Sequence, residues 1–271
     1  MQRRTMLGAM AAMAIGGGVL RGDDARNVPL PRWDLHVHRD NTTLDALLEI
    51  SAEKGVRFGI VEHAGTKEND YPIVLSNDEE LNAYIDSMAE RPCWCGVQAE
   101  WLDWASCFSK ETLARLDYTL GDAMTVRGPG GKRSKLWLDH EIGDVDRFMD
   151  MYAEFHVEVI STQPLDILAN PTWLPDALAP RHDELWNERR LRPIVDALAK
   201  HHMVLEINSQ YLLPHDRMLA MAKDAKVKFS FGSNIRGPEV GKLDYCLAAA
   251  KKHDITIVEM FTPGDDARNR R

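Results

Sequence analysis

The segment Arg32–Asn41, RWDLHVHRDN, places two histidines two residues apart at the end of a short apolar stretch. In an extended strand, residues i and i+2 point to the same face, so His36 and His38 are expected to present both imidazoles on one side. Two imidazoles in this arrangement can bind one metal ion. The motif has low specificity by itself, because two surface or core histidines that bind no metal can show the same His-x-His pattern. Its interpretation therefore depends on the rest of the chain.

Short apolar segments alternate with amphipathic ones along the rest of the chain. TLDALLEISAEKG predicts a helix that ends at Gly55, and SNDEEL opens another helix, with Ser76 and Glu79 at capping-box spacing. The repetition predicts a parallel α/β sheet, and so many repeats favour a closed barrel over an open sheet. Besides RWDLHVH, the strand candidates are VRFGIVEHAG (56–65), CWCGVQAEW (93–101), LDYTLGDAM (116–124), PLDILANP (164–171), MVLEIN (203–208), VKFSFGSN (227–234) and ITIVEMF (255–261).

Polar residues gather at the ends of these strand candidates, directly before the chain turns. Active sites of barrel enzymes are assembled at the C-terminal ends of the strands, so these side chains are expected to meet at one mouth of the barrel. The residues concerned are His36 and His38, Glu62 and His63, Gln98 and Glu100, Asp122, Asn170, Glu206 and Asn208, and Asn234 and Arg236.

The ordered motifs DLHVH, GIVEHAG, GVQAEW, LDYTLGDAM, DILANP, LEIN and FSFGSNIRGPEVGK resemble those of the PHP (polymerase and histidinol phosphatase) superfamily, over about Trp33 to Gly241. The resemblance implies a distorted (β/α)7 TIM-like barrel that binds up to three zinc, manganese or iron ions and hydrolyses phosphoesters. It also implies that His36 and His38 form the first metal-binding pair. His63 matches the histidine of the family's Asp-His motif, with Glu62 in place of the aspartate.

Five ligands that the resemblance implies are replaced in this chain. Gln98 stands where the family has a glutamate that bridges two metal ions, and Met124 stands where it has a histidine. The family's His-Pro appears as Asn170-Pro171, and its Gly-Ser-Asp-Ala-His ends in Asn234 and Arg236. An amide offers only a neutral carbonyl, and arginine cannot bind a cation.

These replacements remove negative charge from the expected site and add one permanent positive charge, that of Arg236. Its repulsion is expected to empty the metal position near His63. The sequence therefore predicts at most one tightly bound divalent ion per chain. Its expected ligands are His36 and His38, with Glu100 and Asp122 as replacement carboxylates.

Three functional hypotheses are open at this point. The first is a hydrolase of a phosphoester or another small anionic, possibly sugar, substrate that uses one zinc, manganese or iron ion. Its expected catalytic residues are His63, Glu206 and Arg236, and its expected substrate contacts are Arg236, Asn170, Asn234 and Trp101. The second is a metal-free acid–base enzyme that uses His36, His38, His63 and Glu206. The third is a barrel that binds a ligand without turning it over.

Composition and the N-terminus give two further expectations. Asp and Glu outnumber Lys and Arg by 42 to 33 without a basic stripe, which argues against a nucleic-acid partner. Residues 1–27 resemble a twin-arginine export signal, because Arg3 and Arg4 precede an Ala/Met/Gly-rich run that is too short for a stable membrane span. An ordinary secretory signal or an uncleaved anchor is the alternative. We therefore expect an exported protein, periplasmic or extracellular, whose barrel domain spans residues 28–271.

The export hypothesis predicts the behaviour of a double variant. Replacing Arg3 and Arg4 by lysine should leave the precursor in the cytoplasm, because a twin-arginine receptor recognises the guanidinium pair whereas a general secretory signal needs only positive charge. Cell fractionation followed by immunoblotting measures the distribution. Normal export of the Lys-Lys variant would rule out the twin-arginine route.

Overall fold

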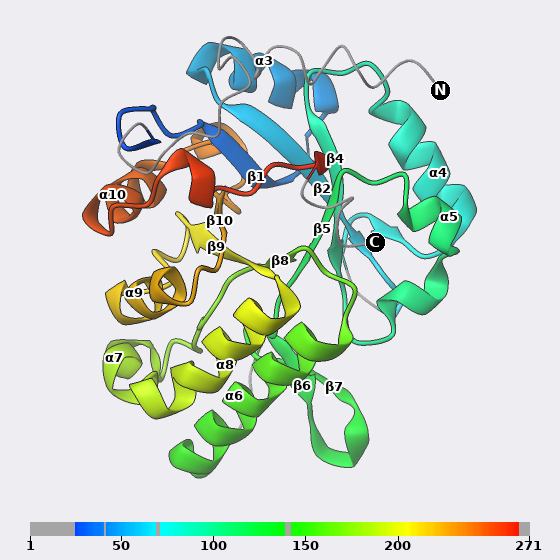
Figure 1. Ribbon diagram of the computed structural model, residues 1–271. Coiled ribbons are helices and arrows are strands. Elements are labelled where there is room, and N and C mark those ends of the chain that lie inside the picture. The colour runs from blue at the N-terminus through cyan, green and yellow to red at the C-terminus, as the bar shows by residue number, and fades with distance from the viewer. Residues whose placement is uncertain (1–24, 41, 69–70, 139–141, 266–271) are drawn as a thin grey trace.

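A curved sheet of parallel strands forms the centre of the protein (Figure 1). The computed structural model describes residues 25–40, 42–68, 71–138 and 142–265. Within them the main path of the sheet runs β1-β2-β4-β5-β8-β9-β10, and each neighbouring pair is parallel. These strands are β1 Trp33–His38, β2 Arg57–Ala64, β4 Trp94–Ala99, β5 Tyr118–Gly121, β8 Ile167–Leu168, β9 Val204–Asn208 and β10 Phe229–Gly232.

Helices surround this sheet on its outer side (Figure 1). The short strand β3 (Val74–Leu75) pairs with β2, and β6 (Thr125–Arg127) and β7 (Arg133–Lys135) form a separate antiparallel hairpin. No helix in the described part of the chain has the length and apolar character needed to cross a membrane. The helices are α3 Leu44–Lys54, α4 Asp78–Ser87, α5 Lys110–Leu113, α6 Val145–Thr162, α7 His182–Leu185, α8 Glu188–His201, α9 Asp216–Asp224 and α10 Asp244–Lys252.

Hydrogen bonds between β1 and the segment after β10 nearly close the sheet into a barrel. The backbone N–H of Asn234 donates to the carbonyl of His36 at 2.9 Å. The buried Asp34 carboxylate accepts from the backbone N–H groups of Ser233 at 2.8 Å and Gly241 at 3.1 Å. The predicted α/β barrel is therefore confirmed, and its first and last strands meet directly beside the two histidines.

Two details of the predicted elements are wrong. ITIVEMF is not a strand: Thr256 and Glu259 form a capping box around a 3-10 turn at Ile257–Glu259, and only Met260 bridges to β10. The cap of α4 is Asn77, whose side chain accepts from the N–H of Glu80, while Glu80 accepts from the N–H of Ser76. The box predicted at Ser76 is thus displaced by one residue. The predicted export signal lies, for residues 1–24, outside the described residues.

An irregularity in β1 directs its side chains into the barrel. The pairing of β1 with β2 changes register between Asp34 and Val37. Leu35 therefore packs in the apolar cluster of the barrel interior, and the rings of His36 and His38, one and three residues later, also turn inward above it. In a regular strand, Leu35 would lie on the face opposite to both histidines.

Tyr118 fills the barrel interior below the histidines, and two glycines make room for its ring. The Tyr118 hydroxyl donates to the carbonyl of Leu35 at 2.8 Å. A Cβ added at Gly96 would lie 2.7 Å from Tyr118 Cζ, and one at Gly59 would lie 3.0 Å from the same atom. Strands β2 and β4 can therefore flank the phenol ring only because these positions lack a side chain.

This packing predicts the effect of a single methyl group. Gly96→Ala should destabilise the protein by about 1–3 kcal/mol, because the buried ring cannot move without displacing its neighbours. Urea unfolding measures the change. In a Tyr118→Leu background the same substitution should cost less, because the group that it collides with is gone. If Gly96→Ala lowered the free energy of unfolding equally in both backgrounds, Tyr118 would not be the group with which the added methyl group collides.

Candidate active site

The carbonyl of Gln98 lies between the two histidines of β1. Its Oε1 is 3.0 Å from His36 Nε2 and 2.9 Å from His38 Nε2. All three side chains are buried, since their exposed fractions are 0%, 3% and 7% for His36, His38 and Gln98. A carbonyl oxygen only accepts hydrogen bonds, so both Nε2 atoms carry a proton in this arrangement. Both imidazoles therefore point to the same side of β1, as predicted, and on that side they meet the amide of Gln98.

Asp122 fixes the orientation of the Gln98 amide. Its Oδ2 accepts from Gln98 Nε2 at 3.3 Å and from Asn170 Nδ2 at 2.9 Å. A flipped Gln98 would point its oxygen at a carboxylate and its NH₂ at two ring nitrogens. Burial, together with the negative charge of Glu100, raises the pKa of Asp122 to about 6. The backbone N–H of Met124, which donates to Asp122 Oδ1 at 2.9 Å, and then the Asn170 amide partly offset the effect of burial on this carboxyl group.

His36 is held between two acceptors and therefore carries a positive charge. Its Nδ1 is 2.6 Å from Glu206 Oε1, while its Nε2 donates to Gln98. Burial by itself would lower the pKa of His36, but the charge and hydrogen bond of Glu206 outweigh burial and raise it. Burial would likewise raise the pKa of Glu206, but His36 and the donors Asn170 and Asn208 lower it. The two directions agree on a buried imidazolium–carboxylate pair.

Gly232 allows this pair to form. A Cβ at this position would collide with Glu206 Oε1 and would lie 2.8 Å from His36 Cβ. The glycine at the end of β10 thus leaves the space through which Glu206, on β9, reaches across to β1.

Three asparagines form a continuous amide network beside the pair. Asn170 Oδ1 accepts from Asn208 Nδ2 at 3.0 Å and from Asn234 Nδ2 at 3.1 Å. The backbone N–H of Asn170 and the Asn208 amide donate to Glu206 Oε2 at 2.7 and 3.0 Å. Asn170 and Asn234 have φ of +44° and +49°, which asparagine tolerates better than most residues. Amides here satisfy one another where the resemblance implies metal ligands.

His38, His63 and Tyr71 form a stack at the edge of the mouth. Ring centroids are 4.6 Å apart for His38 and His63 and 3.6 Å apart for His63 and Tyr71, with interplanar angles of 18° and 9°. His63 Nδ1 donates to Glu100 Oε1 at 2.7 Å. Burial, followed by the neighbouring His63 and the guanidinium of Arg236, lowers the pKa of His38 well below its usual value. His38 is therefore a neutral imidazole.

Two ring nitrogens of this stack are buried and have no hydrogen-bond partner among the described residues, namely His38 Nδ1 and His63 Nε2. In each ring the other nitrogen faces an acceptor, Gln98 or Glu100, so the neutral form of each imidazole would carry its lone pair on these two atoms. One ligand atom each from His38, His63 and Asp40 lie within 4.8 Å of one another. Neutral imidazoles with a fixed tautomer and a carboxylate are the ligands that zinc and related ions prefer.

Arg236 closes the outer side of this group. Its Nε donates to Asp40 Oδ2 at 2.6 Å, and its Nη1 donates to the carbonyl of Asn234 at 2.8 Å. The side chain is 42% exposed, so its charge faces the entrance of the mouth. The guanidinium and a metal ion would compete for the Asp40 carboxylate.

The residues predicted for the site do meet at the C-terminal strand ends, but their contacts differ from a simple metal centre. Both ring nitrogens of His36 have partners, Glu100 bonds to His63, and Asp122 accepts from two amides. The assignment of His36, His38, Glu100 and Asp122 as ligands stays a prediction. So do the catalytic assignments of His63, Glu206 and Arg236 and the substrate contacts of Asn170, Asn234, Arg236 and Trp101.

Trp101 and two residues that the sequence interpretation missed complete the description. The Trp101 ring packs against Phe155 of α6 at 5.9 Å, with the Arg133 guanidinium 5.7 Å above it. Asp40 and Tyr71 were not predicted to contribute. The His-x-Asp spacing from His38 to Asp40 could have indicated the first of them, whereas Tyr71 reaches His63 only through the folded loop after β2.

The donor set does not fit a cluster of three ions, because amides and a guanidinium occupy the positions of the missing ligands. It fits one ion. His38 and His63 each offer a buried nitrogen that has no hydrogen-bond partner within the described ranges, and Asp40 offers a carboxylate. The first position that the resemblance implies, between His36 and His38, holds the Gln98 carbonyl.

Comparisons with known proteins agree with the fold. No family model and no curated protein matches the sequence. Among solved structures, the chain is similar to histidinol phosphate phosphatase from Lactococcus lactis subsp. lactis, determined in complex with zinc, L-histidinol and phosphate. The TM-score is 0.56 at 15% identity, and the match covers 83% of this chain and 94% of that chain.

These observations show an α/β barrel that shares its fold with a histidinol phosphate phosphatase structure. At this identity the likeness establishes the shared fold. The chemistry of this chain has to be inferred from its own side chains.

The buried pair of His36 and Glu206 predicts a pH-dependent contribution to stability. The folded-state pKa of His36 is raised above 6.5 and that of Glu206 is lowered below 4.5. The contribution of this pair to the free energy of unfolding is therefore complete between pH 4.5 and pH 6.5. It is lost as pH rises through the folded pKa of His36 or falls through that of Glu206. Glu206→Gln should cost about 3–5 kcal/mol within this window, because it leaves a buried charge without its partner.

Urea unfolding at about pH 5.5 and about pH 9 measures this difference. Glu80→Gln is the matched control, because Glu80 pairs with Lys67 at the surface and its loss should cost less than about 1 kcal/mol. A cost for Glu206→Gln that is the same at both pH values would show that His36 does not change its charge between them.

Proposed function

We propose that this protein is a PHP-like hydrolase that acts on a small anionic substrate, with phosphate monoesters as the substrate class, and that its barrel mouth holds no more than one divalent ion. The observation that carries the proposal is a pair of buried ring nitrogens, His38 Nδ1 and His63 Nε2, that have no hydrogen-bond partner in the described part of the chain and lie next to the cation Arg236. The similarity in fold to a phosphatase supports the reaction class.

His38, His63 and Asp40 would hold the ion in this proposal. The other nitrogen of each histidine is fixed by Gln98 or Glu100, so the lone pairs are directed before any ion arrives. A bound divalent ion would polarise a phosphoryl oxygen and lower the pKa of a bound water. Since Asp40 is bonded to Arg236, ion binding would release the guanidinium from one of its partners.

Arg236 would bind the anionic group of the substrate. Guanidinium groups bind phosphate and carboxylate in two parallel hydrogen bonds, and Arg236 presents a half-exposed guanidinium at the mouth. The cavity beside Glu100 and Asp122 measures about 20 Å³, which is room for water and too small for a phosphate ester. Access from the side of Arg236 and Asp40 is therefore the favoured route.

Glu206, the asparagines and His36 would act by positioning. Glu206 and His36 lie beneath the surface of the mouth with exposed fractions of 1% and 0%. They hold Gln98 and Asn170, and through Asn170 they hold Asn234, which contacts Arg236. The network thus fixes the place of the anion-binding guanidinium.

A ligand-binding barrel without metal or catalysis is the second candidate. The Gln98 carbonyl between His36 and His38 favours it, because a neutral acceptor has replaced the bridging carboxylate that the resemblance implies. In that case Arg236 would still bind an anion, but no turnover would follow.

Metal titration and phosphatase assays on matched variants distinguish the two candidates. Under the hydrolase proposal, His63→Asn should bind one zinc ion fewer than wild type and lose turnover of a panel of phosphate monoesters. Arg236→Ala should keep the ion and weaken an anionic substrate by roughly 2–4 kcal/mol, seen as a higher KM. Asn234→Asp with Arg236→His should raise the amount of bound metal, since it returns a carboxylate and an imidazole.

His201→Asn, at the end of α8, serves as the control and should leave metal content and activity unchanged. Equal zinc content in wild type and His63→Asn would contradict the assignment of a metal ion to the mouth. If phosphate still bound in an Arg236-dependent manner without turnover of any ester, the ligand-binding candidate would replace the hydrolase.

A further inference from the structure

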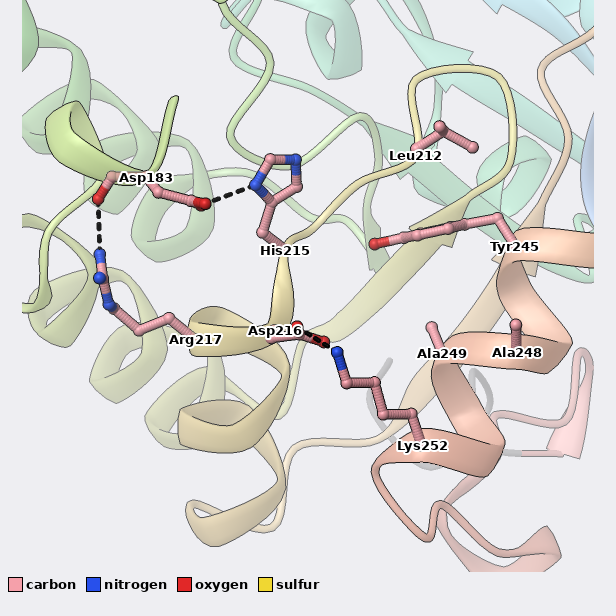
Figure 2. A pocket seen from close by; sticks show the side chains of 9 residues that line it. All are labelled: Asp183, Leu212, His215, Asp216, Arg217, Tyr245, Ala248, Ala249 and Lys252. Carbon is pink, nitrogen blue, oxygen red and sulfur yellow. Dashed lines mark hydrogen bonds and ion pairs between the residues drawn. The ribbon is translucent and has the colours of Figure 1, made fainter. Parts of the chain in front are cut away.

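A second group of metal-binding side chains lies outside the barrel mouth. His182 begins α7, Asp183 follows it, and His215 precedes α9, in the connections that follow β8 and β9. One ligand atom from each of the three residues lies within 4.8 Å of the other two. In Figure 1, α7 and α9 lie next to each other at the edge of the molecule, and Figure 2 shows Asp183 and His215 pointing toward one another.

His182 is already in the state that binds a metal ion. Its Nε2 is 3.0 Å from the carbonyl of Thr172, an acceptor, so this nitrogen carries the ring proton. Its Nδ1 is buried and has no hydrogen-bond partner among the described residues. Histidine ligands typically donate their second nitrogen to a carbonyl in this way.

The spacing of the three groups suits a tetrahedral ion. Asp183 Oδ1 is 2.7 Å from His215 Nδ1 and 3.6 Å from His182 Nδ1, and the two imidazole centroids are 3.9 Å apart. Zinc–ligand bonds of about 2.0–2.1 Å place neighbouring ligands about 3.3 Å apart. Small changes in the exposed Asp183 and His215 side chains would therefore bring all three groups onto one ion.

Two neighbouring features hold the group in place and leave it accessible. Arg217 donates to the backbone carbonyls of Asp183 at 2.7 Å and Trp186 at 3.0 Å, which fastens α7 to α9 (Figure 2). Asp183 and His215 also line a cavity of about 570 Å³, together with Tyr245 and Lys252. The cavity is large enough to supply water to an ion at its wall.

We propose that His182, Asp183 and His215 form a zinc-type site with three protein ligands, separate from the barrel mouth and open to the adjacent cavity. Two imidazoles and one carboxylate favour zinc over magnesium or calcium, which prefer oxygen ligands. This second ion, called the rim ion below, would be held by His182, Asp183 and His215 and would be additional to the ion proposed for the mouth. The limit of one ion per chain that the sequence predicts would then apply to the mouth alone.

The nearby pair of His253 and Asp216 shows what an ordinary contact looks like in the same region. His253 Nε2 is 2.8 Å from Asp216 Oδ1, and Asp216 also pairs with Lys252. Among the described residues, neither residue belongs to a group of three convergent ligands. His253→Asn is therefore the matched control for His215→Asn, since each removes one partially exposed histidine from a pair with an aspartate.

Zinc binding to the full-length chain tests the proposal by calorimetry, with cobalt absorption as a second measurement. Wild type, His253→Asn and the mouth variant His63→Asn should all bind the rim ion. His215→Asn should lose one zinc equivalent or bind it at least 10–100-fold more weakly, as expected for loss of a ligand. Wild type loaded with cobalt should show the intense visible bands of a tetrahedral site, which His215→Asn should lack.

His182→Gln gives a second test that includes the buried ligand, and metal-free thermal unfolding establishes that each variant is folded. Zinc should raise the unfolding temperature of wild type and His253→Asn more than that of His215→Asn. Equal zinc affinity and stoichiometry in His215→Asn and wild type would overturn the proposal. So would loss of all zinc in His63→Asn, since only the mouth would then bind metal.

Discussion

The carbonyl oxygen of Gln98, accepting hydrogen bonds from His36 and His38, determines the arrangement of the barrel mouth. A neutral acceptor between two imidazoles requires a proton on each facing nitrogen, whereas a carboxylate between them would favour a bound cation. With one proton assigned to each Nε2, Glu206 stabilises a second proton on His36, and His38 keeps its lone pair on Nδ1. The remaining hydrogen bonds of the mouth follow from this assignment.

One consequence is that the charged ring of His36 lies beneath the mouth, whereas the ring nitrogens that could bind a metal ion lie at its edge. The imidazolium of His36 is compensated internally by Glu206, and the asparagine network connects that pair to the surface. The stack of His38 and His63 holds two ring nitrogens that have no hydrogen-bond partner among the described residues, and Arg236 lies beside it. Fixed dipoles and charges of this kind bind anions without first having to reorganise.

The fold was largely predictable because it depends on patterns that are local in sequence. The alternation of short apolar runs with amphipathic helices predicted the seven strands of the main path. Helix α3 ends at Gly55, as predicted, and the structure places this glycine in the left-handed conformation. ITIVEMF failed because its apolar pattern also suits a capped 3-10 turn. Only the position of Met260 and Phe261 against β10 decides between the two. The cap at Asn77 was missed by one residue, since Ser76 and Asn77 are both good caps.

The sequence by itself determined which residue types stand at the strand ends, and hence that amides and a guanidinium replace several expected ligands. The tertiary structure decided what each of them contacts. Tautomers and charges in the mouth depend on partners from different strands, as with His36 on β1 and Glu206 on β9. The approach of His182 to His215 depends likewise on how two connections pack. These contacts are set by barrel closure and loop packing, which join residues far apart in the chain, so local patterns cannot specify them.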